Sequence, residues 1–219
     1  LWHGQAPPYT ALFAWLAGGP LPARAAATPF RPVMLSHALE ATDLARLDPA
    51  DFAAEWKWDG IRVQVVHDAH GRRLFSRTGD DIGQAFPDLL EALDFDAALD
   101  GELLVRRDDG IASFSDLQQR LNRKTVTRSM MTKYPVHVRL YDALELGGED
   151  LRHLSLAERR RRLEDWHRQM QPRGTDLSEL VQPDSKEALR RIWEETRSAG
   201  IEGLMLKRRD SPYLAGRPK

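Results

Sequence analysis

Short runs of apolar residues, each bounded by Gly or Asp, dominate the middle of the chain. They are rich in Val, Leu, Ile and aromatic residues, and they are AEWKW (54–58), IRVQVVH (61–67), RLFS (73–76), ALDGELLVRR (98–107) and VHVRLYDALEL (136–146). Runs of this length and composition predict β-strands. A turn that ends at Gly71 separates two of them, which predicts a β-hairpin over residues 63–76.

Helices are predicted after capping boxes, in which the first and fourth residues satisfy each other's backbone N–H groups. The boxes run from Ser115 to Gln118, from Ser155 to Glu158 and from Asp184 to Glu187. The last helix is expected to turn an apolar stripe to the core and to end at a glycine cap: Leu189, Ile192, Trp193 and Thr196, then Gly200. Strands and helices follow one another in mixed order, which predicts an α+β fold with largely antiparallel sheets.

Residues 17–32, AGGPLPARAAATPFRP, combine prolines with glycines and small side chains, and such a segment sustains neither a helix nor a central strand. We interpret it as a linker. The preceding YTALFAWL (9–16) is expected to be the last helix of an upstream domain, and the main domain is expected to begin at about Phe30. Because the first residue is Leu, we also expect the chain to be an excised fragment.

Composition is typical of a globular protein, with 42% apolar and 30% charged residues and a mean hydropathy of -0.52. No apolar run approaches the roughly 20 residues that cross a bilayer. The absence of cysteine excludes disulfides and thiolate zinc sites, and a cytoplasmic location is the default expectation. The net charge of -1 gives no global sign of nucleic-acid binding. The densest basic run, ERRRRLEDWHRQ (158–169), is interpreted as a solvated helix face with helical ion pairs.

The segment EWKWDGIRVQVV (55–66) sets Lys57 between two tryptophans. On a strand, Lys57 and Asp59 would share one face, and Trp56 and Trp58 would point into a core. Gly60 is predicted to let the chain turn back and bring the next arginine near the lysine. Burial and neighbouring cations would then favour a neutral, nucleophilic amine. The alternative is a lysine that merely pairs with Asp59 at the end of a hairpin.

Other charged residues give the reactive interpretation further support. Glu102 lies in the apolar run LDGELLV, where a carboxylate is unfavourable unless it meets a cation, a metal or a ligand hydroxyl. Glu202 and Lys207 lie in IEGLMLK, and Arg77 lies next to a turn in FSRTGDD. Each residue alone could form a structural ion pair. Together they supply an amine nucleophile, carboxylates for Mg²⁺, and cations for phosphate.

The set EWKWDGIR, SRTG, LDGELLV, VRLYDAL and EGLMLKRRDSPYLAGR, in this order, resembles the nucleotidyltransferase motifs of ATP-dependent DNA ligases of the bacterial type. The resemblance covers about residues 30–219. It implies an ATP-grasp-like adenylation domain of largely antiparallel sheets flanked by helices, with the ATP pocket between the sheets. It also implies that residues 1–29 are the tail and linker of an upstream DNA-binding domain.

The resemblance also implies roles for particular residues. Lys57 would attack the α-phosphate of ATP and hold AMP, Glu55 would touch the adenine, and Tyr141 would stack on its ring. The remaining assignments are nucleotide and phosphate contacts by Arg62 and Arg77, a ribose contact by Glu102, Mg²⁺ ligation by Glu202 and Glu102 with Mn²⁺ as a substitute, and further phosphate contacts by Lys207 and Arg217. AMP would then pass to the 5′-phosphate of nicked double-stranded DNA, and the 3′-hydroxyl would displace it.

The chain stops at AGRPK, before the family's two-lysine motif and its oligonucleotide-binding (OB-fold) domain. We therefore expect a monomeric, nucleoid-associated core that seals nicks poorly alone, in replication, repair or recombination. Arg62 indicates ATP, because NAD⁺-using relatives usually have a small residue there. An RNA ligase and a capping-type guanylyltransferase share the lysine chemistry and stay open as alternatives. So does a non-enzymatic module whose arginine helix binds DNA phosphates.

Overall fold

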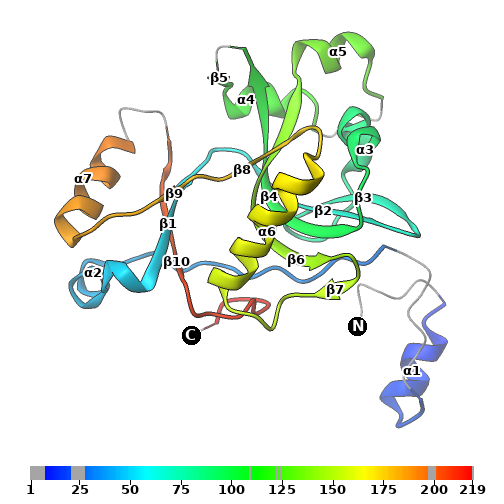
Figure 1. Ribbon diagram of the computed structural model, residues 1–219. Helices are drawn as coiled ribbons and strands as arrows, with labels where there is room; N and C mark the ends of the chain where they lie inside the picture. The colour runs from blue at the N-terminus through cyan, green and yellow to red at the C-terminus, as the bar shows by residue number, and fades with distance from the viewer. Residues whose placement is uncertain are drawn as a thin grey trace.

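The computed structural model describes residues 8–20, 28–108, 110–121, 123, 125–196 and 201–218 (Figure 1). Its α-helices are α1 (Thr10–Leu16), α2 (Ala41–Arg46), α3 (Pro87–Ala92), α4 (Phe114–Gln118), α5 (Arg128–Lys133), α6 (Leu156–Met170) and α7 (Lys186–Thr196), and its 3-10 helices are η2 (Pro49–Asp51) and η3 (Gly83–Ala85). Its strands are β1 (Phe52–Lys57), β2 (Ile61–Asp68), β3 (Gly71–Ser76), β4 (Ala97–Arg107), β5 (Gly110–Ile111), β6 (Val136–Leu146), β7 (Glu149–Asp150), β8 (Thr175–Leu177), β9 (Leu180–Val181) and β10 (Gly203–Arg208). No helix among the described residues is long and apolar enough to cross a membrane.

The strands form two sheets. The larger has the order β3-β2-β4-β6-β7, with β5 paired to β4 and β8 paired to β6, and the smaller has the order β10-β1-β9. All of these pairs are antiparallel except β6 with β8. The predicted α+β class, the strands read from the apolar runs, and the hairpin of β2 and β3 are therefore confirmed.

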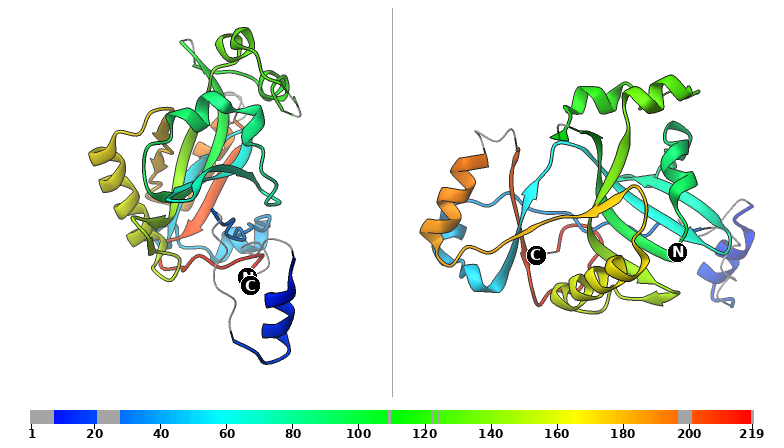
Figure 2. Two further views of the ribbon diagram at one scale, coloured as in Figure 1. Left: turned by 90° about the vertical axis from the view of Figure 1, so that its right-hand side faces the viewer. Right: turned by 45° about the horizontal axis from the view of Figure 1, so that its top comes forward.

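Both faces of the larger sheet are buried, and the alternation of side chains along each strand explains how. Val65 and Leu74 belong to a core that α3 and α6 cover, while their neighbours Val66 and Phe75 belong to a second core on the opposite face. Figure 2 shows α6 against one face of this sheet. On the other face, residues 28–35 pack, and the Gln64 side chain fixes them because it both accepts from and donates to the backbone of Arg31, at 2.8 Å each.

The predicted return of the chain after Lys57 is wrong. β1 and β2 belong to different sheets, so residues 58–60 cross between the sheets and do not close a hairpin. Gly60 is required by close approach: a Cβ there would lie 2.6 Å from the Leu103 carbonyl oxygen and 2.8 Å from Glu102 Cγ. The tryptophans also differ from the prediction, because Trp56 and Trp58 are half-buried and belong to neither core cluster.

The helix predictions are confirmed in part. Ser155 caps α6 as expected, accepting from the Glu158 N–H at 3.3 Å. The first box is wrong, because Ser113 is the N-cap residue of α4 and its side chain makes no capping hydrogen bond. At α7 the hydroxyl of Ser185 accepts from the Ala188 N–H, one position after the predicted cap.

The apolar stripe of α7 is only partly buried. Leu189 and Thr196 are buried as predicted, whereas Trp193 is 46% exposed. The predicted stripe is therefore wrong at Trp193, although α7 packs on the smaller sheet through β10 (Figure 1). The predicted cap at Gly200 lies outside the described residues.

The arginine run forms α6, and its side chains divide between solvent and core. Arg161 and Arg162 pair with Glu158 on the outer face of the helix, as the ion-pair interpretation expects. Arg159 and Arg160 are buried, which corrects the interpretation of the whole run as a solvated face. Arg159 makes a bidentate pair with Asp142 on β6, at 2.8 and 2.9 Å, so it joins the helix to the sheet.

Candidate active site

The register of β1 against β10 places Lys57 beside Glu202. Lys57 lies opposite Gly203, and the Glu202 N–H donates to the Lys57 carbonyl oxygen at 3.1 Å. The Lys57 ammonium forms an ion pair with the Glu202 carboxylate, and both side chains are about half exposed. The expected partner, Asp59, is exposed, so the carboxylate beside this amine comes from a residue far away in the sequence.

A second group of predicted site residues lies around Glu55, which is two positions before Lys57 on the same face of β1. Glu55 is 2% exposed, and its carboxylate accepts from Lys207 Nζ at 2.9 Å. The same ammonium lies 4.1 Å from the centre of the Tyr141 ring on β6. A lysine that joins a buried carboxylate to an aromatic face marks a polar and aromatic lining between the two sheets.

Arg62 lies on β2 of the larger sheet. Its side chain contacts the neighbouring strand β4 and the two chain segments that contain Met34 and Tyr213. Its guanidinium donates to Asp100 at 2.7 Å, to the Tyr213 hydroxyl at 3.1 Å and to the Met34 carbonyl oxygen at 2.6 Å. The Tyr213 hydroxyl in turn donates to Asp100 at 2.6 Å. Asp100 and Tyr213 were missed as functional candidates, although each lies inside a quoted motif and Asp100 interrupts the same apolar run as Glu102.

Replacing Tyr213 with phenylalanine is expected to lower the free energy of unfolding by about 1–3 kcal/mol, because the buried Asp100 carboxylate loses a donor. Chemical unfolding of the purified chain measures this. The control is Tyr134→Phe, since that hydroxyl has no hydrogen-bond partner among the described residues. Equal losses in both variants would contradict a specific role for the hydroxyl of Tyr213.

Glu102 lies opposite Arg62 on β4 and is half-buried. The pKa of this carboxyl is raised from 4.5 to about 8, mainly by burial; the charges of Asp100 and Glu202 also raise it, and those of Arg62 and Lys57 lower it. Carboxylates that repel one another across a site are stabilised when a divalent cation lies between them. The carboxylates of Glu102 and Glu202 are donors of the type that Mg²⁺ takes, so their chemistry fits a divalent cation. No group of three or more His, Asp or Glu side chains in the described ranges could hold a metal by itself.

The raised pKa of Glu102 makes stability depend on pH. Between its unfolded pKa of 4.5 and its folded pKa of about 8, the folded chain binds more protons than the unfolded chain. The free energy of unfolding therefore falls as pH rises through this window. Glu102→Gln should lose that slope in urea unfolding measured from pH 5 to 8. Glu91→Gln, at an exposed position of α3, should keep it; an unchanged slope in Glu102→Gln would contradict the assignment.

Two of the predicted phosphate contacts lie at the surface. Arg77 is exposed in the turn after β3, and Arg217 is exposed near the end of the chain. Neither makes an ion pair or hydrogen bond to another described residue. The structure instead places Arg139 in the site region, with its guanidinium 4.3 Å from the centre of the Trp58 ring. Trp58 thus stacks on a cation that sequence analysis did not assign.

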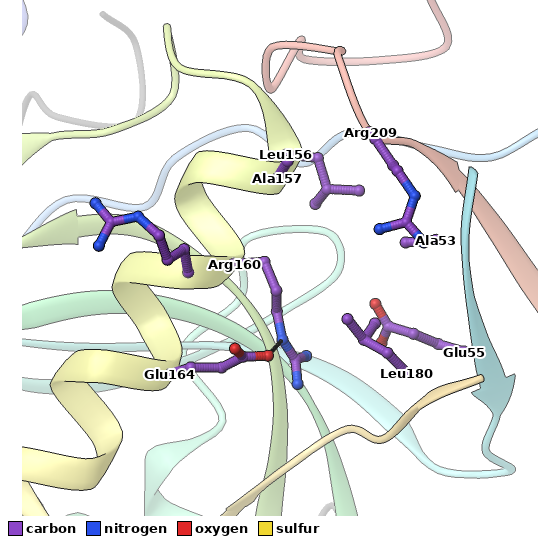
Figure 3. Close-up of a pocket in the computed structure, with 9 residues that line it drawn as sticks. Ala53, Glu55, Leu156, Ala157, Arg160, Glu164, Leu180 and Arg209 are labelled. Atoms are coloured by element: carbon purple, nitrogen blue, oxygen red, sulfur yellow. Dashed lines mark hydrogen bonds and ion pairs between the residues drawn. The ribbon is translucent and has the colours of Figure 1, made fainter. Parts of the chain in front are cut away.

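A cavity of about 160 Å³ extends the Glu55 face of β1 toward α6. Glu55 and Arg160 point into it from opposite sides, and Leu180 of β9 lies between them (Figure 3). The rest of its lining is Ala53, Leu156, Ala157, Arg161, Glu164 and Arg209. Ala53 and Glu55 line the cavity, and Lys57 follows them on the same face of β1.

A family model described as an ATP dependent DNA ligase domain matches residues 33–219. The DNA ligase of Methanoculleus marisnigri is 35% identical over 193 residues, which are 86% of this chain and 34% of that protein. The DNA ligase of Archaeoglobus fulgidus is 31% identical over 189 residues, 84% of this chain and 34% of that protein. The chain thus spans about a third of these relatives.

A solved structure of a mycobacterial DNA ligase D complexed with ATP and MES is also similar. It superposes with a TM-score of 0.66 at 32% identity, over 85% of this chain and 56% of that one.

Proposed function

The chain belongs to the ATP-dependent DNA ligase domain family, and from this premise we propose that it is the adenylation core of a DNA ligase in which Lys57 takes AMP from ATP. The observation that carries the proposal is the position of Lys57. It lies beside Glu202, on the same strand face as Glu55 and within the matched segment. Several partly buried charged groups around a lysine are typical of a functional site.

The proposed reaction forms a bond between Lys57 Nζ and the α-phosphorus of ATP and breaks the bond to the bridging oxygen. Pyrophosphate leaves with that electron pair, and the ammonium loses its proton before attack, because only the neutral amine is a nucleophile. Glu202 contacts the ammonium and so holds the lysine side chain in place. The covalent lysine–AMP intermediate would divide the transfer of AMP into two steps, and each step would have a lower barrier than a single direct transfer.

The proposed nucleotide lies between the two sheets. Its adenine would stack on Tyr141 and meet Glu55 at its amino group, and the Lys207 ammonium that now joins these two residues would move to the phosphates. Glu102 would meet the ribose, and the arginines at positions 62, 77 and 217 would contact the nucleotide and its phosphates. Arg77 and Arg217 are exposed and make no ion pair with another described residue, so their guanidiniums are available to an anionic ligand.

Mg²⁺ would bind at Glu102 and Glu202 and would neutralise charge on the triphosphate. Glu102 must give up its proton for this, since burial raises the pKa of its carboxyl to about 8. The positive charges of Arg62 and Lys57 act in the opposite direction and lower this pKa. Binding of the cation is therefore expected to release a proton near neutral pH.

In the whole protein, the AMP would pass to the 5′-phosphate of nicked double-stranded DNA for sealing by the 3′-hydroxyl. Residues 1–29 would be the tail and linker of an upstream DNA-binding domain, residues 30–219 the adenylation domain, and a downstream OB-fold domain would complete the catalytic set. The proposed location is the nucleoid in the cytoplasm, where the substrate lies. This core alone is expected to seal nicks weakly.

Labelled nucleotides test the proposal. The chain is incubated with Mg²⁺ and with α-labelled ATP, α-labelled GTP or NAD⁺ labelled in its adenylate, and then with nicked DNA or nicked RNA. We expect label on the protein from ATP alone, followed by transfer to nicked DNA. Label from GTP would indicate a capping-type enzyme, transfer to RNA alone an RNA ligase, and salt-sensitive DNA binding without any label a binding module.

The binding-module alternative loses its main support in the structure. It requires the arginines of α6 to be available for DNA phosphates. Arg159 and Arg160 are buried, and Arg161 and Arg162 already pair with Glu158. Their charges are therefore largely compensated within the protein.

A further inference from the structure

We infer that Arg160 is a base-reading residue, and the inference rests on the proposed function: its free Nη1 donates to a ring nitrogen of the adenine whose amino group meets Glu55. Arg160 comes from α6, outside every sequence motif to which a nucleotide role was assigned. Its place on the cavity wall opposite Glu55 is shown in Figure 3.

The first observation is an unsatisfied donor. Arg160 is 8% exposed. Its Nε donates to Glu164 at 2.6 Å and its Nη2 to the Ser178 carbonyl oxygen at 2.6 Å. Its Nη1 is buried and has no hydrogen-bond partner among the described residues. A buried guanidinium that lacks one acceptor is unfavourable, so the position favours a ligand that supplies it.

The second observation is that two of its contacts fix the direction of the third. A guanidinium is planar, with its donors in a rigid fork. Because Glu164 and Ser178 hold Nε and Nη2, Nη1 cannot rotate independently of them. Arg160 therefore presents one donor from a prearranged position, as a specificity-determining residue must.

The third observation is the character of the cavity. Its charged lining residues are Glu55 and Glu164 with Arg160, Arg161 and Arg209, and the rest of the wall is apolar. Most of these charges are already paired inside the protein: Glu164 with Arg160, Glu55 with Lys207, and Arg161 with Glu158. A neutral planar group that carries both donors and acceptors fits this lining, since ligand sites combine apolar walls with few polar groups.

Adenine has that chemistry. Its exocyclic amine donates, and the ring nitrogens N1 and N7 on either side of the amine accept. A carboxylate from Glu55 and a donor from Arg160 would together read an amine and one adjacent ring nitrogen. Guanine places a carbonyl oxygen where adenine places the amine, so the carboxylate of Glu55 would repel it.

A cycle of variants and analogues tests the inference. The rate constant for adenylylation of Lys57 is measured at low nucleotide concentration with ATP, 1-deaza-ATP and 7-deaza-ATP, for the unaltered chain, Arg160→Met and Arg168→Met. With one of the two analogues, the rate constant of the unaltered chain should be roughly 10- to 100-fold lower than with ATP. This is the loss expected when a hydrogen bond from a charged donor is removed. The analogue that loses rate identifies the nitrogen that Arg160 contacts.

Arg160→Met should lose a similar factor with ATP and show no further loss on that analogue. Arg168→Met should behave like the unaltered chain, because Arg168 lies on the same helix but is exposed, pairs with Asp165 and does not line the cavity. The inference would be overturned if Arg160→Met lost as much rate on that analogue as the unaltered chain does. It would also be overturned if the unaltered chain had equal rate constants with all three nucleotides.

Thermal unfolding checks that each variant folds. If Arg160→Met does not fold, Arg160→Lys takes its place in the cycle with the same expectation, because an ammonium cannot make the three contacts of the fork. Failure of the proposed function is distinguishable: the unaltered chain would then form no adduct with ATP. An adduct without coupling between Arg160 and a ring nitrogen overturns this inference alone.

Discussion

Lys57→Ala is expected to form no AMP adduct after incubation with ATP and Mg²⁺, whereas the unaltered chain gains the mass of one AMP. The reason is chemical: alanine has no nucleophile, and Glu202, which contacts the lysine, cannot form a phosphoramidate. Intact-mass spectrometry of both purified chains, before and after incubation, measures the adduct directly. It also shows whether the lysine already carries AMP on purification.

Lys133→Ala is the matched control. It removes an ammonium on α5 that lies over the Tyr134 ring and away from the site, so full adenylylation is expected. An adduct on Lys57→Ala would mean that another residue is the nucleophile. If the unaltered chain forms no adduct even when the C-terminal domain of a related ligase is added, Lys57 is a structural residue.

Arg159→Ala should have the largest effect on stability, a loss of about 3–5 kcal/mol in the free energy of unfolding. The guanidinium is 2% exposed and its partner Asp142 7% exposed, so alanine leaves a carboxylate buried without its cation. It also removes donors from the Leu154 and Ser211 carbonyl oxygens. Burial already raises the pKa of Asp142, and without Arg159 that pKa should rise further. Urea unfolding at neutral pH measures the loss.

Arg161→Ala, on the same helix, is the comparison. Its side chain is 60% exposed, and exposed ion pairs contribute about 0–1 kcal/mol. Asp142→Ala should match the loss of Arg159→Ala, and the double variant should lose less than the two losses added together, because no unpaired buried charge remains. Equal small losses in Arg159→Ala and Arg161→Ala would show that the pair at Asp142 contributes nothing to stability.

Local patterns determine much of the fold because side-chain alternation is itself local. The strand periodicity of β2, β3, β4 and β6 assigns their residues to the two faces of the sheet. The turn at Gly71 determines its hairpin, since neighbouring strands joined by a short turn can only pair. The cap at Ser155 likewise needs only residues within one helical turn.

The sequence predictions were wrong where a contact with a distant segment decides the structure. Whether Gly60 closes a hairpin or lets the chain cross to a second sheet depends on β4, which a Cβ at Gly60 would strike. Whether Trp193 is buried depends on which other segments pack against α7, and 46% of it is exposed. Whether Arg159 is solvated depends on Asp142, which lies on another element. In each case the deciding contact is made by a residue that the local pattern does not contain.

For the site, the sequence by itself determined which residue types are present and the family to which they point: a lysine between tryptophans, carboxylates in apolar strands, and cations after them. Only the tertiary structure decided their partners. It paired Lys57 with Glu202, joined Lys207 to Glu55 and Tyr141, and placed Arg160 over the same face of β1. The physical reason is that charge interactions depend on distance in space, and antiparallel pairing of β1 with β10 brings together residues about 150 positions apart.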